Sequence, residues 1–311
     1  MIQRAIELLE GQHFGFQLVL PQSQGGRVIS GNWNQDNLVI PFSLRATPGE
    51  VGGKSLNKDG YIQLVNKAIS AMAENNWQKI VTSRCFHLNH ASWDKARYIQ
   101  SLRDRFPESY FIVFNHPVWG IWMAASPELL MKRSGIELET MALAGTLSAE
   151  SSEDWGKKEL NEHEVVRNMI VQTLTENDVN EIHVHPRNEL YFKTVRHLQT
   201  KITGHYKGDD LKLIHALSPT PALAGMPVQQ TVEWLVENEG YKRGLYGGVI
   251  SVKEGREVYA VVLLRCIHVK GEQIFGFVGG GVMPNSNAEI EWNETVMKQN
   301  AFIFAADESN Q

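Results

Sequence analysis

The segment GGGVMPNSNAEIEWNE near the C-terminal end brings a glycine-rich stretch and several carboxylates together. Glu291 and Glu294 would lie one turn apart on the same face of a helix. Two acidic groups in that position repel each other unless a cation lies between them, and such oxygen-rich sites suit Mg²⁺. Glycines Gly279 to Gly281 would let an anion approach the backbone closely. A solvated acidic helix start, favoured by the helix dipole, is the alternative.

The start of this helix has a sequence signal of its own. Ser286 and Glu289 have the spacing of a capping box, in which each side chain binds a backbone N–H of the other residue. The helix is therefore expected to begin near Asn287, directly after a glycine-rich turn.

Composition excludes several classes of protein. The chain has 311 residues, of which 42% are hydrophobic and 21% charged, and this indicates an ordered globular protein. A formal net charge of −5 without a basic stripe argues against nucleic acid as a partner. No apolar run is long enough for a membrane span and no signal peptide is recognisable, so we expect a cytoplasmic protein. Cys85 and Cys266 are too few for a disulfide framework or a zinc site.

Hydrophobic periodicity predicts an α+β fold, with helices packed on antiparallel sheets. A small β region is expected first, with strands at 14–20, 26–29 and 38–44. Helices are expected at 61–72, 160–174, 212–216 and 228–239, and from 287 onward. Further strands are expected at 79–86, 111–114, 120–125, 129–132, 136–143, 245–252, 258–269 and 274–278.

A second glycine-rich segment, GEVGGKS at residues 49–55, is similar to a phosphate-binding loop. The first glycine that such a loop requires falls on Pro48, and residues 57–60 separate the segment from the following helix. The segment therefore does not predict nucleotide binding.

Several segments, read in order, resemble the chorismate-utilising enzymes. This family holds isochorismate synthase, salicylate synthase and the large components of anthranilate and aminodeoxychorismate synthases. The segments are KIVTSR (79–84), SPELL (126–130), LAGT (143–146), NEHE (161–164), PTPALAGMP (219–227), YGG (246–248), LRC (264–266) and the stretch 279–294.

The resemblance covers roughly residues 60–306 and implies one chorismate-binding domain over residues 1–311. Two large antiparallel sheets flanked by helices are expected. Residues 1–58 would form a shortened N-terminal β region with a connector, and residues 59–311 the catalytic core.

Within that family the resemblance favours isochorismate synthase. Lys79 stands where anthranilate synthases have glutamine, and Ala144 stands where aminodeoxychorismate synthases carry a lysine nucleophile. Because alanine cannot form a covalent adduct, water rather than ammonia is the expected nucleophile. Salicylate synthase, which next eliminates pyruvate, and a chorismate-binding protein with little turnover are the alternatives. The product would serve menaquinone or siderophore synthesis.

The reaction needs a base and an acid, because water must attack C2 of chorismate while the C4 hydroxyl leaves. Lys79 is the expected base, provided that burial or nearby cations keep it neutral. Glu128 is the expected acid, and an apolar wall would keep it protonated.

The resemblance implies Mg²⁺ as the cofactor, with Glu162, Glu291 and Glu294 as the metal-binding residues. No glutamine amidotransferase subunit is expected, and the protein would be a monomer or a homodimer.

Chorismate carries two carboxylates, and both must be neutralised. Arg265, expected on a strand, would hold the enolpyruvyl carboxylate with its guanidinium fork. The other substrate-binding positions implied by the resemblance are Gly145, Thr146, His197, Ala222, Gly279 and Gly281. Two departures from the family pattern stand out: Ser218 replaces a histidine, and residues 147–150 lack the usual arginines.

Overall fold

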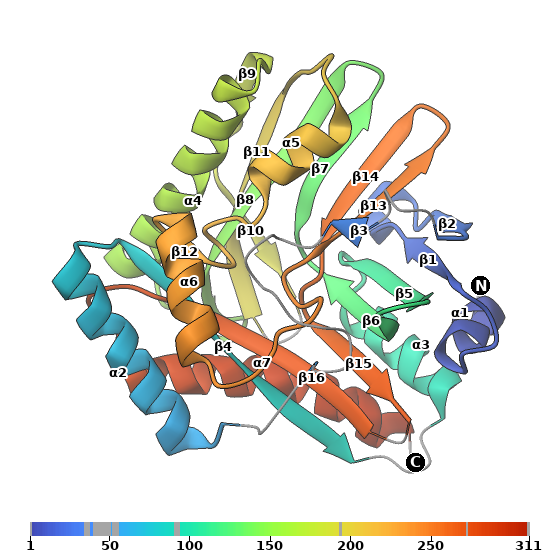
Figure 1. Ribbon diagram of the computed structural model, residues 1–311, viewed down its shortest axis with the longest axis horizontal. Helices are drawn as coiled ribbons and strands as arrows, with labels where there is room; N and C mark the ends of the chain where they lie inside the picture. Colours follow the sequence, from blue (N-terminus) through green and yellow to red (C-terminus); the bar gives the residue numbers. More distant parts are fainter. Residues whose placement is uncertain are drawn as a thin grey trace.

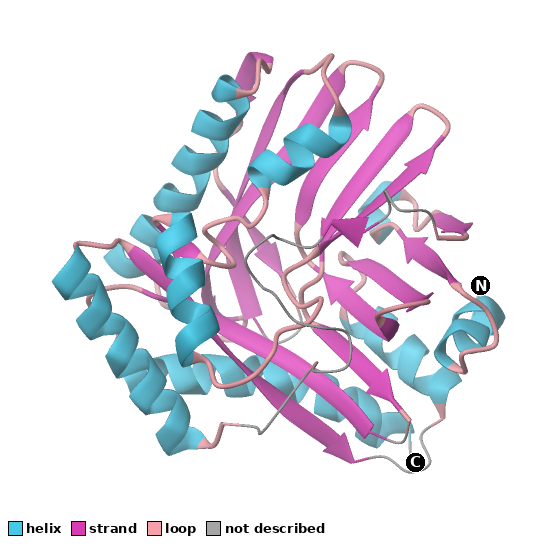
Figure 2. Cartoon of the chain, viewed as in Figure 1, coloured by secondary structure: helices cyan, strands magenta, loops and turns pink. Residues whose placement is uncertain are grey.

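The computed structural model describes residues 2–33, 38–39, 51, 56–89, 94–192, 195–271 and 273–309. Within these residues, two antiparallel sheets lie face to face and helices cover their outer sides (Figures 1 and 2). The expected α+β fold with two large antiparallel sheets is confirmed.

The first sheet is built around the long pairing of β4 with β16, which run side by side in Figure 1. Its strands, in spatial order, are β12 (Gly225–Met226), β4 (Lys79–Asn89), β16 (Gln273–Val282), β15 (Cys266–Lys270), β6 (Gly120–Ser126), β5 (Tyr110–His116), β1 (Gly15–Val19) and β2 (Val28–Gly31).

The second sheet is built around β11 and β8. Its strands, in spatial order, are β10 (Asn188–Tyr191), β11 (Val195–His205), β8 (Glu137–Ser148), β7 (Leu129–Ser134), β14 (Glu257–Val262), β13 (Val249–Glu254) and β3 (Leu38–Val39), and β9 (Asn180–Val184) pairs with the far end of β11.

Helices shield the outer face of each sheet from water. The first sheet is covered by α1 (Ile2–Leu9), α2 (Lys58–Asn75), α3 (Lys95–Arg105) and α7 (Ala288–Ser309), with α6 (Val228–Asn238) beside β12. The second sheet is covered by α4 (Lys157–Glu176) and α5 (Asp210–Leu217). Across the described ranges, every helix is too short or too polar to span a lipid bilayer.

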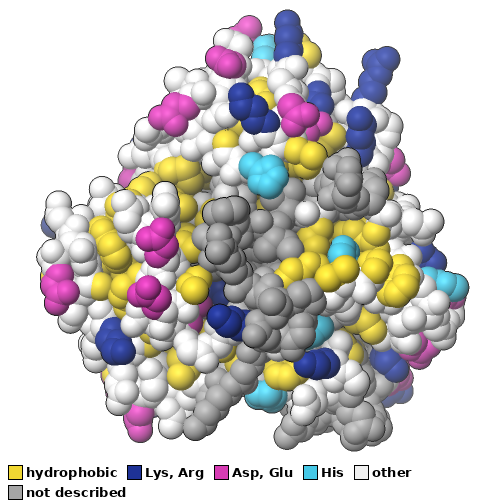
Figure 3. All heavy atoms as spheres, in the orientation of Figure 1, with side chains coloured by type: hydrophobic (Ala, Val, Ile, Leu, Met, Phe, Trp, Pro, Cys, Tyr) yellow, Lys and Arg dark blue, Asp and Glu magenta, His cyan; other side chains and the backbone are white. Residues whose placement is uncertain are grey.

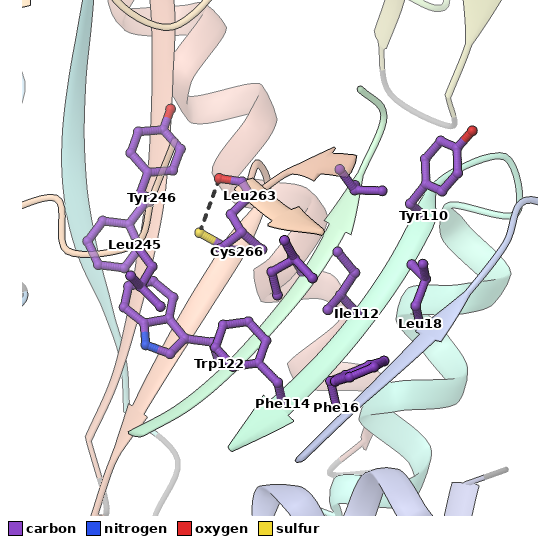
Figure 4. Packing of buried hydrophobic residues seen from close by; sticks show 14 of the residues in the cluster. Phe16, Leu18, Tyr110, Ile112, Phe114, Trp122, Leu245, Tyr246, Leu263 and Cys266 are labelled. Atoms are coloured by element: carbon purple, nitrogen blue, oxygen red, sulfur yellow. Dashed lines mark hydrogen bonds between the residues drawn. The ribbon is translucent and has the colours of Figure 1, made fainter. Parts of the chain in front are cut away.

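The inner faces of the two sheets share an apolar core. Phe16 and Leu18 of β1 and Trp122 of β6 belong to the same buried cluster as Leu245 and Tyr246, which precede β13 (Figure 4). Burial of such large side chains is the main favourable term in folding. This core holds the two sheets together and fixes the distance between them.

Surface charge follows the expectation from composition. On the face seen in Figure 3, acidic and basic side chains are scattered among one another.

The structure corrects the predicted order of elements in several places. Helices α1 and α3 and strands β9, β10 and β11 were not anticipated. β9 is mostly exposed on both faces, so it has no hydrophobic alternation that sequence could reveal. The strand predicted at 258–269 is two strands, β14 and β15, which belong to different sheets. Residues 40–44 and most of the segment 49–55 lie outside the described residues.

Candidate active site

A cavity opens between the sheets and contains about 690 Å³ of space, counting the part that is open to solvent. Residues from β8, β11, β16, α4 and α7 line it. All predicted site residues except Lys79 and Glu291 are part of its lining, namely Glu128, Gly145, Thr146, Glu162, His197, Ala222, Arg265, Gly279, Gly281 and Glu294. Residues far apart in sequence therefore meet at one site.

Glu128 lies in the short connection between β6 and β7 and is only 2% exposed. Burial raises the pKa of its carboxyl to about 7, although a hydrogen bond from Thr220 and the charge of Lys79 act in the opposite direction. The Thr220 hydroxyl donates to Glu128 Oε1 at 3.3 Å. Near neutral pH this side chain can therefore hold a proton and also release it. Thr220 was missed, although it lies in the PTPA segment.

Lys79 is the first residue of β4 and is completely buried. Its Nζ lies 2.9 Å from Glu162 Oε1. Gly281 makes this contact possible, because a Cβ atom there would come within 2.0 Å of Glu162 Oε1 and 2.8 Å of Lys79 Cε. The base predicted from the sequence is therefore placed beside the cavity, in an ion pair with a residue of its lining.

Each of the three predicted metal-binding glutamates is paired with a lysine. The pairs are Glu162 with Lys79 at 2.9 Å, Glu291 with Lys158 at 2.6 Å and Glu294 with Lys298 at 2.6 Å. Lys158 and Lys298 were missed in the sequence. The sequence did contain a signal for both lysines. Lys158 stands four residues before Glu162, and Lys298 stands four residues after Glu294, so each lysine shares a helical face with a predicted metal-binding glutamate.

Two of these carboxylates meet at Gly280. The position that a Gly280 Cβ would occupy lies 3.4 Å from both Glu291 Oε2 and Glu294 Oε1. Glu291 Oε2 is buried and has no hydrogen-bond partner among the described residues. Burial, and next the nearby Glu294 carboxylate, raises the pKa of Glu291. Two carboxylates that approach the same glycine, one of them with a buried oxygen that lacks a partner among the described residues, are donors of the type that a small hard cation binds.

The third carboxylate, Glu162, lies against the next residue of the same strand, Gly281. Glu162 and Glu294 both line the cavity. In the described part of the chain, no three acidic, histidine or cysteine side chains converge as in a formed metal site. Carboxylate oxygens are donors that Mg²⁺ binds, and Mg²⁺ takes few of them from a protein. Among the described residues, however, Glu162, Glu291 and Glu294 do not already converge on one point.

Arg265 lies in the bend between β14 and β15 with φ at 46°, and the prediction that it belongs to a strand is wrong. The chain passes from one sheet to the other here, so the side chain reaches the cavity between them. Its guanidinium lies over the rings of Phe192 and Phe106, 4.0 and 5.0 Å from their centres. Burial lowers the pKa of Arg265 to about 9.

The guanidinium of Arg265 has no carboxylate partner among the described residues. Nη2 lies 2.8 Å from His197 Nε2, and the buried Nη1 has no hydrogen-bond partner. A buried cation that lacks a counterion is costly, and an anionic ligand would remove that cost.

His197 is oriented by a β-bulge. The register between β11 and β8 shifts at His197, and Gly145 is the extra residue, with φ at 77°. His197 Nδ1 lies 3.0 Å from the Gly145 carbonyl oxygen, which can only accept. Burial, and next the charge of Arg265, lowers the pKa of His197 well below its usual range. The ring is therefore neutral, with its proton on Nδ1 and a lone pair on Nε2 for Arg265.

Helix α7 begins at Ala288, close to the predicted start at Asn287, but its cap differs from the prediction. Asn287, rather than Ser286, accepts from the first backbone N–H groups, those of Glu289 and Ile290. Glu289 instead pairs with Lys58 at 2.6 Å, so the predicted capping box is wrong. The prediction of a glycine-rich turn directly before the helix is also wrong. Gly279 to Gly281 belong to strand β16 and pair with β4.

Residues 41–305 match the family of chorismate binding enzymes. The chain belongs to this family. Isochorismate synthase EntC of Escherichia coli (strain K12) is 30% identical over 257 residues, which cover 78% of this chain and 65% of EntC. Isochorismate synthase MenF of the same strain is 28% identical over 252 residues, which cover 76% of this chain and 58% of MenF. The family member described here thus spans somewhat less than two thirds of the length of these relatives.

Solved structures of chorismate binding enzymes have the same fold. MenF, the menaquinone-specific isochorismate synthase from Escherichia coli, superimposes with a TM-score of 0.72 at 25% identity, over 83% of this chain and 64% of MenF. Anthranilate synthase component I from Streptococcus pneumoniae TIGR4 superimposes with a TM-score of 0.68 at 19% identity, over 83% of this chain and 60% of that protein.

Proposed function

We propose that this protein is an isochorismate synthase, which converts chorismate to isochorismate with Mg²⁺ as cofactor. The observation that carries the proposal is the placement of Lys79 and Glu128 at one cavity that also holds the unpaired guanidinium of Arg265. Similarity to EntC and MenF supports the choice of reaction.

Arg265 would bind one carboxylate of chorismate, with the Phe192 and Phe106 rings and the neutral His197 holding its guanidinium in place. A guanidinium fork matches a carboxylate geometrically. This contact would orient the substrate ring between the acid and the base, which lowers the entropy cost of reaction.

Glu128 would donate its proton to the C4 oxygen as the C4–O bond breaks, so that water leaves. Lys79 would accept a proton from the water that forms the new bond at C2, while the ring double bonds shift. Lys79 would accept this proton only as a neutral amine, so its own proton must first pass to solvent, and loss of the contact with Glu162 would favour that release. Mg²⁺, held by Glu294 with Glu162 or Glu291, would neutralise a substrate carboxylate as a Lewis acid.

Incubation of the purified protein with chorismate, with and without Mg²⁺, followed by chromatography, tests this function. Isochorismate that forms only with Mg²⁺ is the expected product. Salicylate and pyruvate without a second enzyme would identify a salicylate synthase instead. Binding of chorismate by calorimetry with no product after long incubation would reject both enzymes.

The rate should depend on pH through Glu128. Since burial raises the pKa of this acid to about 7, its protonated form is lost as pH rises through neutrality. We expect kcat to fall on the alkaline side, in measurements from about pH 5 to about pH 9. A kcat that stays constant across this range would contradict the role of Glu128 as the acid.

Gly280→Ala is expected to weaken Mg²⁺ binding by about tenfold or more, because its methyl group would touch two carboxylates of the proposed metal site. At 3.4 Å from both oxygens the methyl fits without a severe clash, so the fold should be kept. Calorimetric titration with Mg²⁺ measures the affinity, and thermal unfolding without metal controls for stability. Unchanged affinity in a stable variant would show that the cation does not bind beside Gly280.

A further inference from the structure

Lys158 differs from Lys79 and Lys298, the other two lysines of the site, in its exposure and its hydrogen bonds. Lys79 is fully buried, and Lys298 also donates to the Gly279 carbonyl oxygen at 2.8 Å. The ammonium of Lys158 has Glu291 as its one hydrogen-bond partner among the described residues, at 2.6 Å. The Lys158 side chain is 18% exposed, whereas that of Glu291 is 0% exposed. Lys158 can therefore reach solvent by rotating its side chain, while Glu291 cannot.

Lys158 lies near all three carboxylates that are proposed to bind the metal. Its ammonium interacts electrostatically with Glu291, Glu294 and Glu162, and these carboxylates outweigh burial and raise its pKa. It occupies only Oε1 of Glu291, and the buried Oε2 is left without a partner. Because the ammonium contacts one oxygen only, it neutralises the group of Glu162, Glu291 and Glu294 incompletely.

We propose that Lys158 is an internal cation that competes with Mg²⁺ for Glu291, so that metal binding moves its ammonium off the carboxylate. The inference rests on the proposed metal site and adds a regulatory element to it. The exchange is electrostatically reasonable, since a divalent ion satisfies both Glu291 and Glu294 whereas the ammonium satisfies one. The measured affinity for Mg²⁺ then depends on how much more strongly Glu291 binds Mg²⁺ than the Lys158 ammonium, and not on the carboxylates alone.

Calorimetric titration with Mg²⁺ alone, without chorismate, tests the proposal on Lys158→Met and on Lys157→Met. Lys157 is the exposed neighbour on the same helix and controls for loss of one positive charge near the site. Lys158→Met is expected to bind Mg²⁺ about tenfold more tightly than the wild type, and Lys157→Met to bind it equally well. Equal or weaker binding by Lys158→Met would overturn the proposal.

Because Lys158→Met removes one member of a buried pair, it could fail to fold without metal. A measurement on the wild-type protein avoids this problem. Trace acetylation of lysines, read by peptide mass spectrometry, should show a higher reactivity of Lys158 when Mg²⁺ is added, with Lys157 as the internal reference. Unchanged reactivity of Lys158 at saturating Mg²⁺ would also overturn the proposal.

These experiments separate the inference from the proposed function. Mg²⁺ binding with equal affinity in both lysine variants and the wild type rejects only the competition by Lys158. Absence of Mg²⁺ binding in all three proteins rejects the metal site itself, and with it the cofactor of the proposed reaction. Neither measurement depends on turnover of chorismate.

Discussion

Glu128→Gln should lower kcat by about 10²- to 10⁴-fold, the usual contribution of a positioned general acid. Glutamine keeps the shape of the side chain and can still meet the Thr220 hydroxyl, but it cannot donate a proton to the leaving oxygen. Chorismate should therefore bind with an affinity close to that of the wild type. Initial rates and calorimetric titration with chorismate measure the two effects separately.

Glu150→Gln is a suitable control for this variant, because it removes an exposed carboxylate from the loop between β8 and α4. It should retain the wild-type rate. A Glu128→Gln protein with a wild-type rate would refute the assigned acid, and a parallel loss of binding would indicate a role in holding the substrate instead.

Arg265→Met should weaken chorismate binding by about 100-fold or more, the cost expected when a buried charge pair loses one partner. The same substitution should leave the ligand-free protein at least as stable as the wild type. The guanidinium lies buried over the rings of Phe192 and Phe106, with no carboxylate partner among the described residues, and methionine would fill such an apolar space without an unpaired charge. Calorimetry with chorismate and thermal unfolding without ligand give the two readings.

Arg265→Lys distinguishes charge from geometry at this position. It keeps a positive charge but lacks the fork that matches a carboxylate, so its affinity should lie between those of the wild type and Arg265→Met. If Arg265→Met is strongly destabilised and binds chorismate normally, Arg265 is a structural residue rather than a ligand for the substrate.

Much of the fold could be predicted from hydrophobic periodicity. The long helices α2 and α4 and the strands β5, β6 and β7 have clear apolar patterns and lie where the sequence indicated. The bend at Arg265 could not be predicted, because residues 258–269 form a continuous run of strand-forming residues. The break is imposed by the passage of the chain from one sheet to the other, which depends on residues far away in the sequence.

The start of α7 shows the same limit at a smaller scale. Ser286 and Glu289 have the right spacing for a capping box, yet Asn287 is the residue whose side chain accepts from the helix N-terminus. Lys58, more than two hundred residues earlier in the chain, draws Glu289 away into an ion pair. The residues around Ser286 and Glu289 cannot predict this ion pair, because only folding brings Lys58 close to Glu289.

By itself, the sequence determined which family this chain belongs to and which residue types meet at the site, because those are carried by short segments with characteristic spacing. Tertiary structure alone decided how the charges are paired. It placed a lysine on each of Glu162, Glu291 and Glu294, and within the described part of the chain it gave Arg265 no counterion. The physical reason is that electrostatic pairing depends on distance and burial in space, and the two sheets bring these residues together from distant parts of the chain.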